Sequence, residues 1–339
     1  MSTPSQKPSD RKSALKDSFN RRIDYLRVSI TDKCNLKCVY CTPRNDLHFF
    51  RRSEVLSYEE IVRFITIAAQ YGLKKVRITG GEPLIRRDIV SLIASIKEVG
   101  IRDISITTNG TMLRKHALSL KRAGLDRVNI SLDTLSPERY EKITKGGNIH
   151  HVWEALEEAE SVGLSPVKIN VVPIRGLNDD EIESFASLSF EKNYHIRFIE
   201  FMPVGANSLW EKNKSISSSE VKERVATLGA LEQLRFRGGG PSRNYRIEGA
   251  KGVIGIISPL TDHFCKYCNR LRLSADGKIR PCLFSDREVD IKTPMRNGIS
   301  DKGIEELFHR AIKAKPRGHM LKKNRSSSCS LEAMSKIGG

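Results

Sequence analysis

Short apolar runs alternate with amphipathic stretches through the first two-thirds of the chain. The runs are rich in β-branched residues, and in the stretches between them apolar residues recur every three or four positions, so strands and helices are expected in turn. Ser57 and Glu60 form the S-x-x-E pattern of a capping box at the start of one such helix. Strands are expected at 25–30, 75–79, 103–107, 127–132, 167–172 and 196–201, and helices at 58–71, 89–99, 111–122 and 179–190.

This alternation predicts an α/β fold with a parallel sheet, because βαβ units join parallel strands through right-handed crossovers. Six units are fewer than the eight of a closed barrel, so we expect an incomplete (βα)6 TIM-type barrel rather than a flat doubly wound sheet. After Gly205 the pattern changes to a helix at 217–228 and short strand-like pieces around Tyr245 and at 253–257. The expected parts are a flexible N-terminal arm at 1–21, the partial barrel at 22–210 and a C-terminal α+β extension at 211–339.

Charge points to an anionic partner. The 339 residues include 58 Lys and Arg against 40 Asp and Glu, a formal net charge of +18. Nucleic acid fits such a charge, and so does a polyphosphate substrate in a basic cleft. The basic run at 310–325, seven Lys or Arg without an acid, is interpreted as a solvated surface. No apolar run approaches the roughly 18 residues of a membrane span, and no secretory signal precedes the fold, so a cytoplasmic location without a membrane partner is expected.

Six of the seven cysteines lie in two groups of three, and the first group directly follows the first expected strand. Cys34, Cys38 and Cys41 have the spacing C-x3-C-x2-C. Three thiolates can bind three irons of a four-iron cluster and leave the fourth iron open to chelate a ligand, and this motif is the signature of radical S-adenosylmethionine enzymes. Zinc or redox-active thiols are the alternative, although zinc usually takes four ligands and paired CxxC spacing.

Polar motifs stand at the carboxyl ends of the next three strands. Gly80-Gly-Glu-Pro83 follows the second, 107–110 ends the third and 131–133 ends the fourth. Packing alone gives no reason for polar groups at these successive positions. In radical S-adenosylmethionine enzymes the Gly-Gly-Glu-Pro segment binds the methionine amino end of the cofactor through its backbone and glutamate, and glycine permits the close backbone approach.

The second group, Cys265, Cys268 and Cys282, has the spacing C-x2-C-x13-C. A second open-iron cluster that binds substrate is one interpretation, and a structural zinc with His263 as fourth ligand is the other; the spacing does not separate them. Segments 262–273 and 275–284 around these cysteines resemble GTP 3′,8-cyclase, the MoaA family. The resemblance extends from about residue 22 to the last residue and includes 76–88, 127–133, 198–203 and the terminal pair Gly338-Gly339.

The resemblance implies a radical lyase that cyclises GTP to (8S)-3′,8-cyclo-7,8-dihydroguanosine 5′-triphosphate, the first step of molybdenum-cofactor biosynthesis. It implies two 4Fe-4S clusters and S-adenosyl-L-methionine, whose 5′-deoxyadenosyl radical takes the 3′ hydrogen of GTP before the ribose attacks C8. The first triad would hold the cluster that cleaves this cofactor, and the second triad a cluster whose free iron meets the guanine. The implied cofactor contacts are Tyr40, Gly81, Ser131 and Met202. The implied GTP contacts are Arg27, Lys75, Arg77, Thr108, Lys168, Arg197, Arg270, Leu271 and Arg272.

Four of these basic residues, Lys75, Arg77, Lys168 and Arg197, lie on three expected strands and could converge on one cavity. A triphosphate carries about four negative charges, and the arginine fork suits phosphate oxygens. For any single Lys or Arg, a surface charge or a structural ion pair is the alternative. Met202 could likewise be a core residue.

The implied partners are GTP, a reductant protein such as flavodoxin or ferredoxin, and a downstream cyclic pyranopterin monophosphate synthase. A homodimer is also expected, and nucleic acid is not. Two other classes stay open. A different radical enzyme, such as a peptide maturase or an RNA-modifying enzyme, is one, although a maturase extension is usually richer in cysteine. A zinc-bearing nucleic-acid-binding protein is the other, and it leaves Gly80-Gly-Glu-Pro83 and the first triad unexplained.

Overall fold

The strands of the chain form a single sheet in the computed structural model, which describes residues 15–41, 49–204, 210–235, 240–319 and 334–337. Within these residues the strand order is β12-β11-β10-β1-β2-β3-β4-β5-β6-β9-β8-β7. The strands are β1 (Tyr25–Ser29), β2 (Lys75–Thr79), β3 (Asp103–Thr108), β4 (Arg127–Ser131), β5 (Lys168–Val171), β6 (His195–Ile199), β7 (Leu231–Leu234), β8 (Arg243–Ile247), β9 (Val253–Ile257), β10 (Arg270–Leu273), β11 (Lys278–Arg280) and β12 (Val289–Asp290).

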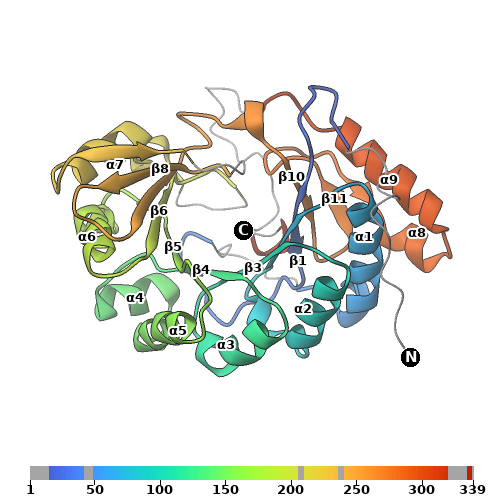
Figure 1. Cartoon of the computed structure of the whole chain (residues 1–339), viewed down its shortest axis with the longest axis horizontal. Coiled ribbons are helices and arrows are strands. Elements are labelled where there is room, and N and C mark those ends of the chain that lie inside the picture. The colour runs from blue at the N-terminus through green and yellow to red at the C-terminus, as the bar shows by residue number, and fades with distance from the viewer. Residues whose placement is uncertain (1–14, 42–48, 205–209, 236–239, 320–333, 338–339) are drawn as a thin grey trace.

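Helices cover the outer face of this curved sheet, as Figure 1 shows for α1 to α6. The predicted capping box is present at the start of α1: the Glu60 amide donates to Ser57 Oγ (3.2 Å), and the Ser57 amide donates to Glu60 Oε2 (2.7 Å). The helices are α1 (Tyr58–Gln70), α2 (Ile89–Glu98), α3 (Leu113–Arg122), α4 (Pro137–Thr144), α5 (His150–Ser161), α6 (Ile182–Glu191), α7 (Ser218–Ala226), α8 (Lys292–Arg296), α9 (Asp301–Lys313) and α10 (Met334–Ile337). None of the described helices is long and apolar enough to span a membrane.

The predicted α/β fold with an incomplete barrel is confirmed, and its parallel region is wider than the six expected strands. Strand β10 pairs in parallel with β1, and β9 pairs in parallel with β6, so two strands of the C-terminal extension flank the six. Antiparallel pairs, β11 with β12 and β8 with β7, then complete the two edges. The extension thus shares the sheet and the cavity of the barrel. The boundary near residue 210 stays a prediction.

Side chains on the parallel strands alternate between a core and an inner cavity. On β1, Leu26 and Val28 are buried under the helices, whereas Tyr25 and Arg27 line the cavity. Outside the sheet, the ring of Phe64 on α1 packs edge-to-face against Phe308 on α9, 5.4 Å between centroids. This period-two alternation allows charged residues inside a sheet whose other face is fully apolar.

The described part of the N-terminal arm is packed, although a flexible arm was expected for 1–21. Leu15 belongs to the core, and Asp17 and Arg21 form a buried ion pair of 2.6 Å. A polar sequence had suggested mobility, but here the charges neutralise each other and are held by main-chain groups.

Candidate functional site

A cavity of about 1230 Å³ opens on the inner face of the sheet, and both cysteine triads line it. The first triad follows the carboxyl end of β1. Cys268 precedes β10, which is parallel to β1, and Cys282 follows β11, which is antiparallel to β10. The two triads therefore approach from opposite ends of the strands. The volume exceeds that of common single-ligand pockets, so more than one small molecule fits between the triads.

The loop of the first triad is anchored to the Gly80–Gly81 segment by main-chain hydrogen bonds. The Gly81 amide donates to the Thr31 carbonyl (2.7 Å), and the Glu82 amide donates to the Lys33 carbonyl (2.8 Å). A Cβ on Gly81 would lie 2.1 Å from the Lys33 oxygen, and one on Gly80 would lie 2.4 Å from the Thr31 oxygen. Glycine is required here because the main chain at Gly80 and Gly81 packs directly against the main chain of the cysteine loop.

Glu82 of the same motif makes hydrogen bonds that join two strand ends, and its expected contact with the cofactor stays a prediction. Its carboxylate is fully buried and accepts from the amides of Leu84 (3.0 Å) and Asn109 (2.7 Å) and from Thr108 Oγ1 (2.8 Å). Burial raises the pKa of Glu82 to about 7, against the effect of these hydrogen bonds. The carboxylate thus ties the ends of β2 and β3 together and fixes the Thr108 hydroxyl at the cavity wall.

The four expected cofactor contacts, Tyr40, Gly81, Ser131 and Met202, all line the cavity near the first triad. The Tyr40 hydroxyl donates to Asp133 Oδ2, and its ring meets Phe201 edge-to-face at 6.4 Å. Asp133 Oδ1 accepts from the Val172 amide (2.8 Å), so this carboxylate links β4 and β5 to the cysteine loop. Burial raises the pKa of Asp133 to about 6.

A wall of basic side chains lies on the strands between the two triads. Strand register places four arginines in one row, because Arg27 is opposite both Arg272 and Arg77, and Ser105 bridges Arg77 to Arg127. The neighbouring positions add further cations on β2, β5, β6 and β10. Lining the cavity are Arg27, Lys75, Arg77, Arg127, Lys168, His195, Arg197, Arg270 and Arg272.

This concentration of positive charge is costly without an anion. Burial, and then the neighbouring Arg197, lowers the pKa of Lys168 to about 6. Burial and then Arg77 lower the pKa of Arg197 to about 9, and burial and then Arg270 lower that of Arg272 to about 10. Among the described residues, Asp103, which pairs with Arg127, is the one acidic side chain in this wall. A ligand with several negative charges would relieve the repulsion.

The second triad lies among cations, in contrast to the first. Burial opposes ionisation of Cys268, but Arg270 and Lys315 lower its pKa to about 6. In the first triad, burial and the neighbouring Cys34 raise the pKa of Cys41 to about 12. Thiolates crowded there need a positive charge among them, and the iron of a cluster supplies one.

Both triads consist of free thiols and fit iron–sulfur ligation. In the described part of the chain, no three Cys, His, Asp or Glu side chains are arranged to hold a single metal ion. A four-iron cluster makes a different demand, since each cysteine binds a separate iron. His263, the fourth ligand of the zinc alternative, faces His319 instead, with 3.2 Å between Nδ1 and Nε2.

Two expected contacts need separate comment. Leu271 lies between Arg270 and Arg272 on β10, so its side chain points to the opposite face, where it is buried in the core. The Leu271 side chain is therefore not on the cavity wall and cannot make the expected contact with GTP from there. Gly338 and Gly339 lie outside the described residues, although Met334 of α10, four residues earlier, lines the cavity.

Sequence reasoning missed three basic residues of the cavity, Arg127, His195 and Lys315. The period-two alternation would have indicated the first two, since Arg127 is four residues from Ser131 and His195 two from Arg197 on their strands. Lys315 belongs to the basic run at 310–325 that was interpreted as a solvated surface. It is 3% exposed, so that interpretation is wrong for this residue.

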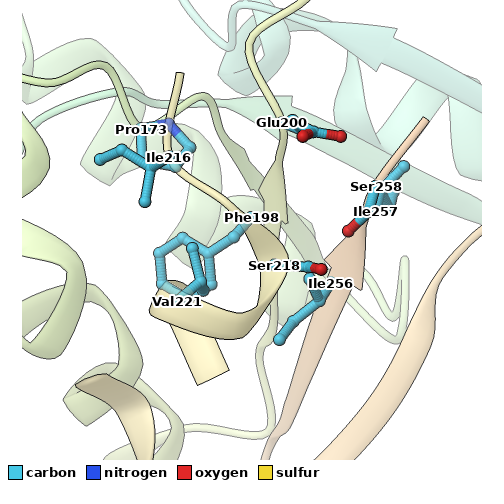
Figure 2. A pocket seen from close by; sticks show the side chains of 9 residues that line it. All are labelled: Pro173, Phe198, Glu200, Ile216, Ser218, Val221, Ile256, Ile257 and Ser258. Carbon is cyan, nitrogen blue, oxygen red and sulfur yellow. The ribbon is translucent and has the colours of Figure 1, made fainter. Parts of the chain in front are cut away.

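A second, much smaller cavity lies behind β6 and β9 (Figure 2) and has a volume of about 10 Å³, the size of one water molecule. Its acidic member is Glu200, whose Oε2 accepts from the amides of Leu260 (2.8 Å) and Thr261 (3.1 Å). The carboxylate holds the turn that precedes the second triad. This cavity is too small for a substrate.

Comparison with known proteins defines the class first. Residues 28–188 match the Radical SAM superfamily, and residues 194–321 match Molybdenum Cofactor Synthesis C. The crystal structure of Streptococcus suis SuiB bound to S-adenosylmethionine shares the fold, with a TM-score of 0.59 at 16% identity over 94% of this chain and 76% of that one. Fold, first triad and superfamily together describe a radical S-adenosylmethionine enzyme.

Relatives of nearly the same length narrow the class. The GTP 3′,8-cyclase of Thermodesulfovibrio yellowstonii is 50% identical over 96% of this chain and 100% of its own length. That of Heliobacterium modesticaldum is 47% identical over 95% of this chain and 99% of its own. The chain belongs to the GTP 3′,8-cyclase family.

Proposed function

We propose that this chain cyclises GTP to (8S)-3′,8-cyclo-7,8-dihydroguanosine 5′-triphosphate at the start of molybdenum-cofactor biosynthesis. The observation that carries the proposal is the large cavity with a cysteine triad at each end and a buried basic wall between them. A substrate that spans this cavity needs an anionic tail and a part that can ligate iron. A nucleoside triphosphate with a purine base meets both requirements.

Each group of cavity residues has its own role in this proposal, according to where it lies. Cys34, Cys38 and Cys41 would hold one 4Fe-4S cluster, and Cys265, Cys268 and Cys282 the other; when bound, the first with S-adenosylmethionine supplies a carbon-centred radical, and the second an open iron for guanine. Tyr40, Gly81, Ser131 and Met202 would orient the cofactor. The phosphates and ribose would meet Arg27, Lys75, Arg77, Thr108, Lys168, Arg197, Arg270 and Arg272.

The wall near the first triad also suits radical chemistry. Val172, Ile199 and Met202 line the cavity at the carboxyl ends of β5 and β6, the same end of the sheet as the first triad. Their apolar side chains offer no acidic proton to the reacting atoms. They favour a dry contact between cofactor and ribose, which limits side reactions of the radical.

A labelled substrate tests the proposal. Reconstituted protein is incubated anaerobically with GTP deuterated at the 3′ position, S-adenosylmethionine and a chemical reductant. We expect the cyclised triphosphate, with deuterium recovered in 5′-deoxyadenosine. Cofactor cleavage without GTP consumption would refute GTP as the substrate, although the protein would still be a radical S-adenosylmethionine enzyme.

Three finer expectations belong to the same proposal. The electron donor would be a flavodoxin or ferredoxin, the product would pass to a cyclic pyranopterin monophosphate synthase, and the chain would form a homodimer. The basic net charge of +18 supports an acidic redox partner. The three-part division at residues 21 and 210 is likewise a proposal.

A further inference from the structure

Lys315 lies just beyond α9 and reaches the second triad from behind. Its side chain is 3% exposed, and its ammonium donates to Cys268 Sγ (3.5 Å), to the Arg270 carbonyl (2.7 Å) and to the Pro281 carbonyl (2.8 Å). Cys268 and Pro281 belong to the two separate segments that carry the triad, because Pro281 directly precedes Cys282. One buried cation thus joins both cysteine-bearing segments and contacts a ligand sulfur.

Arg21 links Cys265, the remaining cysteine of the triad, to the residues that directly follow Lys315. Its guanidinium donates to the Cys265 carbonyl (2.7 Å) and to the carbonyls of Pro316 (2.6 Å) and Arg317 (3.0 Å). Asp17 neutralises this arginine through a 2.6 Å ion pair. Segments from the N-terminus and from residues 315–317 therefore meet behind the second triad.

We propose that Lys315 is a positioning residue that sets both the retention and the reduction potential of the second cluster, whereas the Asp17–Arg21 pair contributes to retention alone. The inference rests on the proposed function only in requiring that the second triad holds a cluster. Lys315 lines the cavity beside the triad, whereas Asp17 and Arg21 lie outside the cavity lining, and neither role follows from the cysteine spacing.

The physical basis differs for the two cations. Hydrogen bonds and positive charge at a ligand sulfur stabilise the reduced, more negative state of a cluster and so raise its potential. Lys315 has no carboxylate partner among the described residues, so its charge acts on the sulfur directly. Arg21 contacts a carbonyl rather than a sulfur, and the adjacent Asp17 cancels most of its field.

The experiment compares five reconstituted proteins. Four are the unmutated protein, Lys315→Met, Lys315→Arg, and the double variant Asp17→Asn with Arg21→Met, which leaves the net charge unchanged. Lys313→Met, an exposed neighbour at the end of α9, is the matched control. Iron release to a chelator and the midpoint potential of each cluster, followed by electron paramagnetic resonance, are the readouts. The first cluster in each protein reports that the chain is folded.

For Lys315→Met we expect iron release from the second cluster to rise about 10- to 100-fold and its midpoint potential to become more negative. Lys315→Arg keeps the positive charge, so the midpoint potential of its second cluster should equal that of the unmutated protein. The double variant should release iron faster at an unchanged potential, and Lys313→Met should behave as unmutated. Unchanged retention and potential in Lys315→Met, or equal iron loss from both triads, would overturn the proposal. An unmutated protein with one cluster would instead refute the proposed function.

Discussion

The ionisation of Lys168 should depend on what binds in the cavity. It is 7% exposed, and within the described residues it makes no hydrogen bond or ion pair. Since burial and Arg197 lower its pKa to about 6, the amine should be mostly neutral at pH 8 before a ligand binds. An adjacent phosphate would stabilise the charged form and raise the pKa.

Binding of GTP is therefore expected to take up close to one proton at pH 8 through Lys168. The affinity component due to this residue should rise as pH falls from 8 to 6 and level off below 6, where the free amine is already charged. Calorimetry in buffers of different ionisation enthalpy measures the uptake. Lys168→Met removes this component while the protons of the phosphate itself remain, so equal uptake in the two proteins would contradict the assignment.

Arg197 should discriminate the triphosphate from the nucleoside. Its Nε is buried without a hydrogen-bond partner among the described residues, and only a 3.5 Å contact joins its guanidinium to Asn129. A charge-assisted hydrogen bond contributes about 1.5–3 kcal/mol, so Arg197→Met should weaken GTP binding about 10- to 100-fold and guanosine binding far less. Equilibrium dialysis with both ligands checks this. Arg102→Met, exposed before β3, is the control, and equal losses for both ligands would exclude a phosphate contact.

Among the elements, the turn after β2 controls the cysteine loop after β1. Gly81→Ala would place a Cβ 2.1 Å from the Lys33 carbonyl oxygen. Because that oxygen is a main-chain atom, the clash cannot be relieved by rotating a side chain. We expect the first triad to be displaced, with loss of its iron and of cofactor cleavage, while the second triad keeps its iron. Iron content and 5′-deoxyadenosine release measure the two effects.

Gly240→Ala is a suitable comparison for this variant, because a Cβ there meets nothing within 4 Å. It should keep the full iron content. Full iron and normal cofactor cleavage in Gly81→Ala would show that the loop can move aside, contrary to the packing described.

The elements also show what a sequence can and cannot predict. Alternation and capping located β1 to β6 with α1, α2, α3 and α6, because these signals are local. Helices α4 and α5 were missed although Ser136 caps α4, its Oγ accepting from the Arg139 amide (3.3 Å). The parallel pairing of β9 with β6 and of β10 with β1 could not be inferred, because a strand's partner depends on residues far away in the sequence. Lys315 was missed for the same reason: its acceptors lie 34 to 47 residues away.

For the whole molecule, the metal content distinguishes the two-cluster arrangement from the zinc alternative. Fully reconstituted protein should contain about eight irons per chain and negligible zinc, since each triad suits a four-iron cluster. Cys34→Ala should halve the iron and abolish cofactor cleavage. Cys329→Ser, outside both triads, should change neither. One cluster's worth of iron with zinc in the second triad would contradict the arrangement.

The pairing of β10 with β1 has a consequence for how the protein is made. Asp24 and Asn269, joined by a 2.6 Å hydrogen bond at this seam, are 245 residues apart. At about 5–20 residues per second, a ribosome needs roughly 12–50 s to deliver β10 after β1 has emerged. Throughout that interval one edge of β1 is bare, and an unpaired edge is a template for aggregation. Nascent chains therefore need protection of this edge, and iron can be loaded into a finished cavity only after nearly the entire chain has been synthesised.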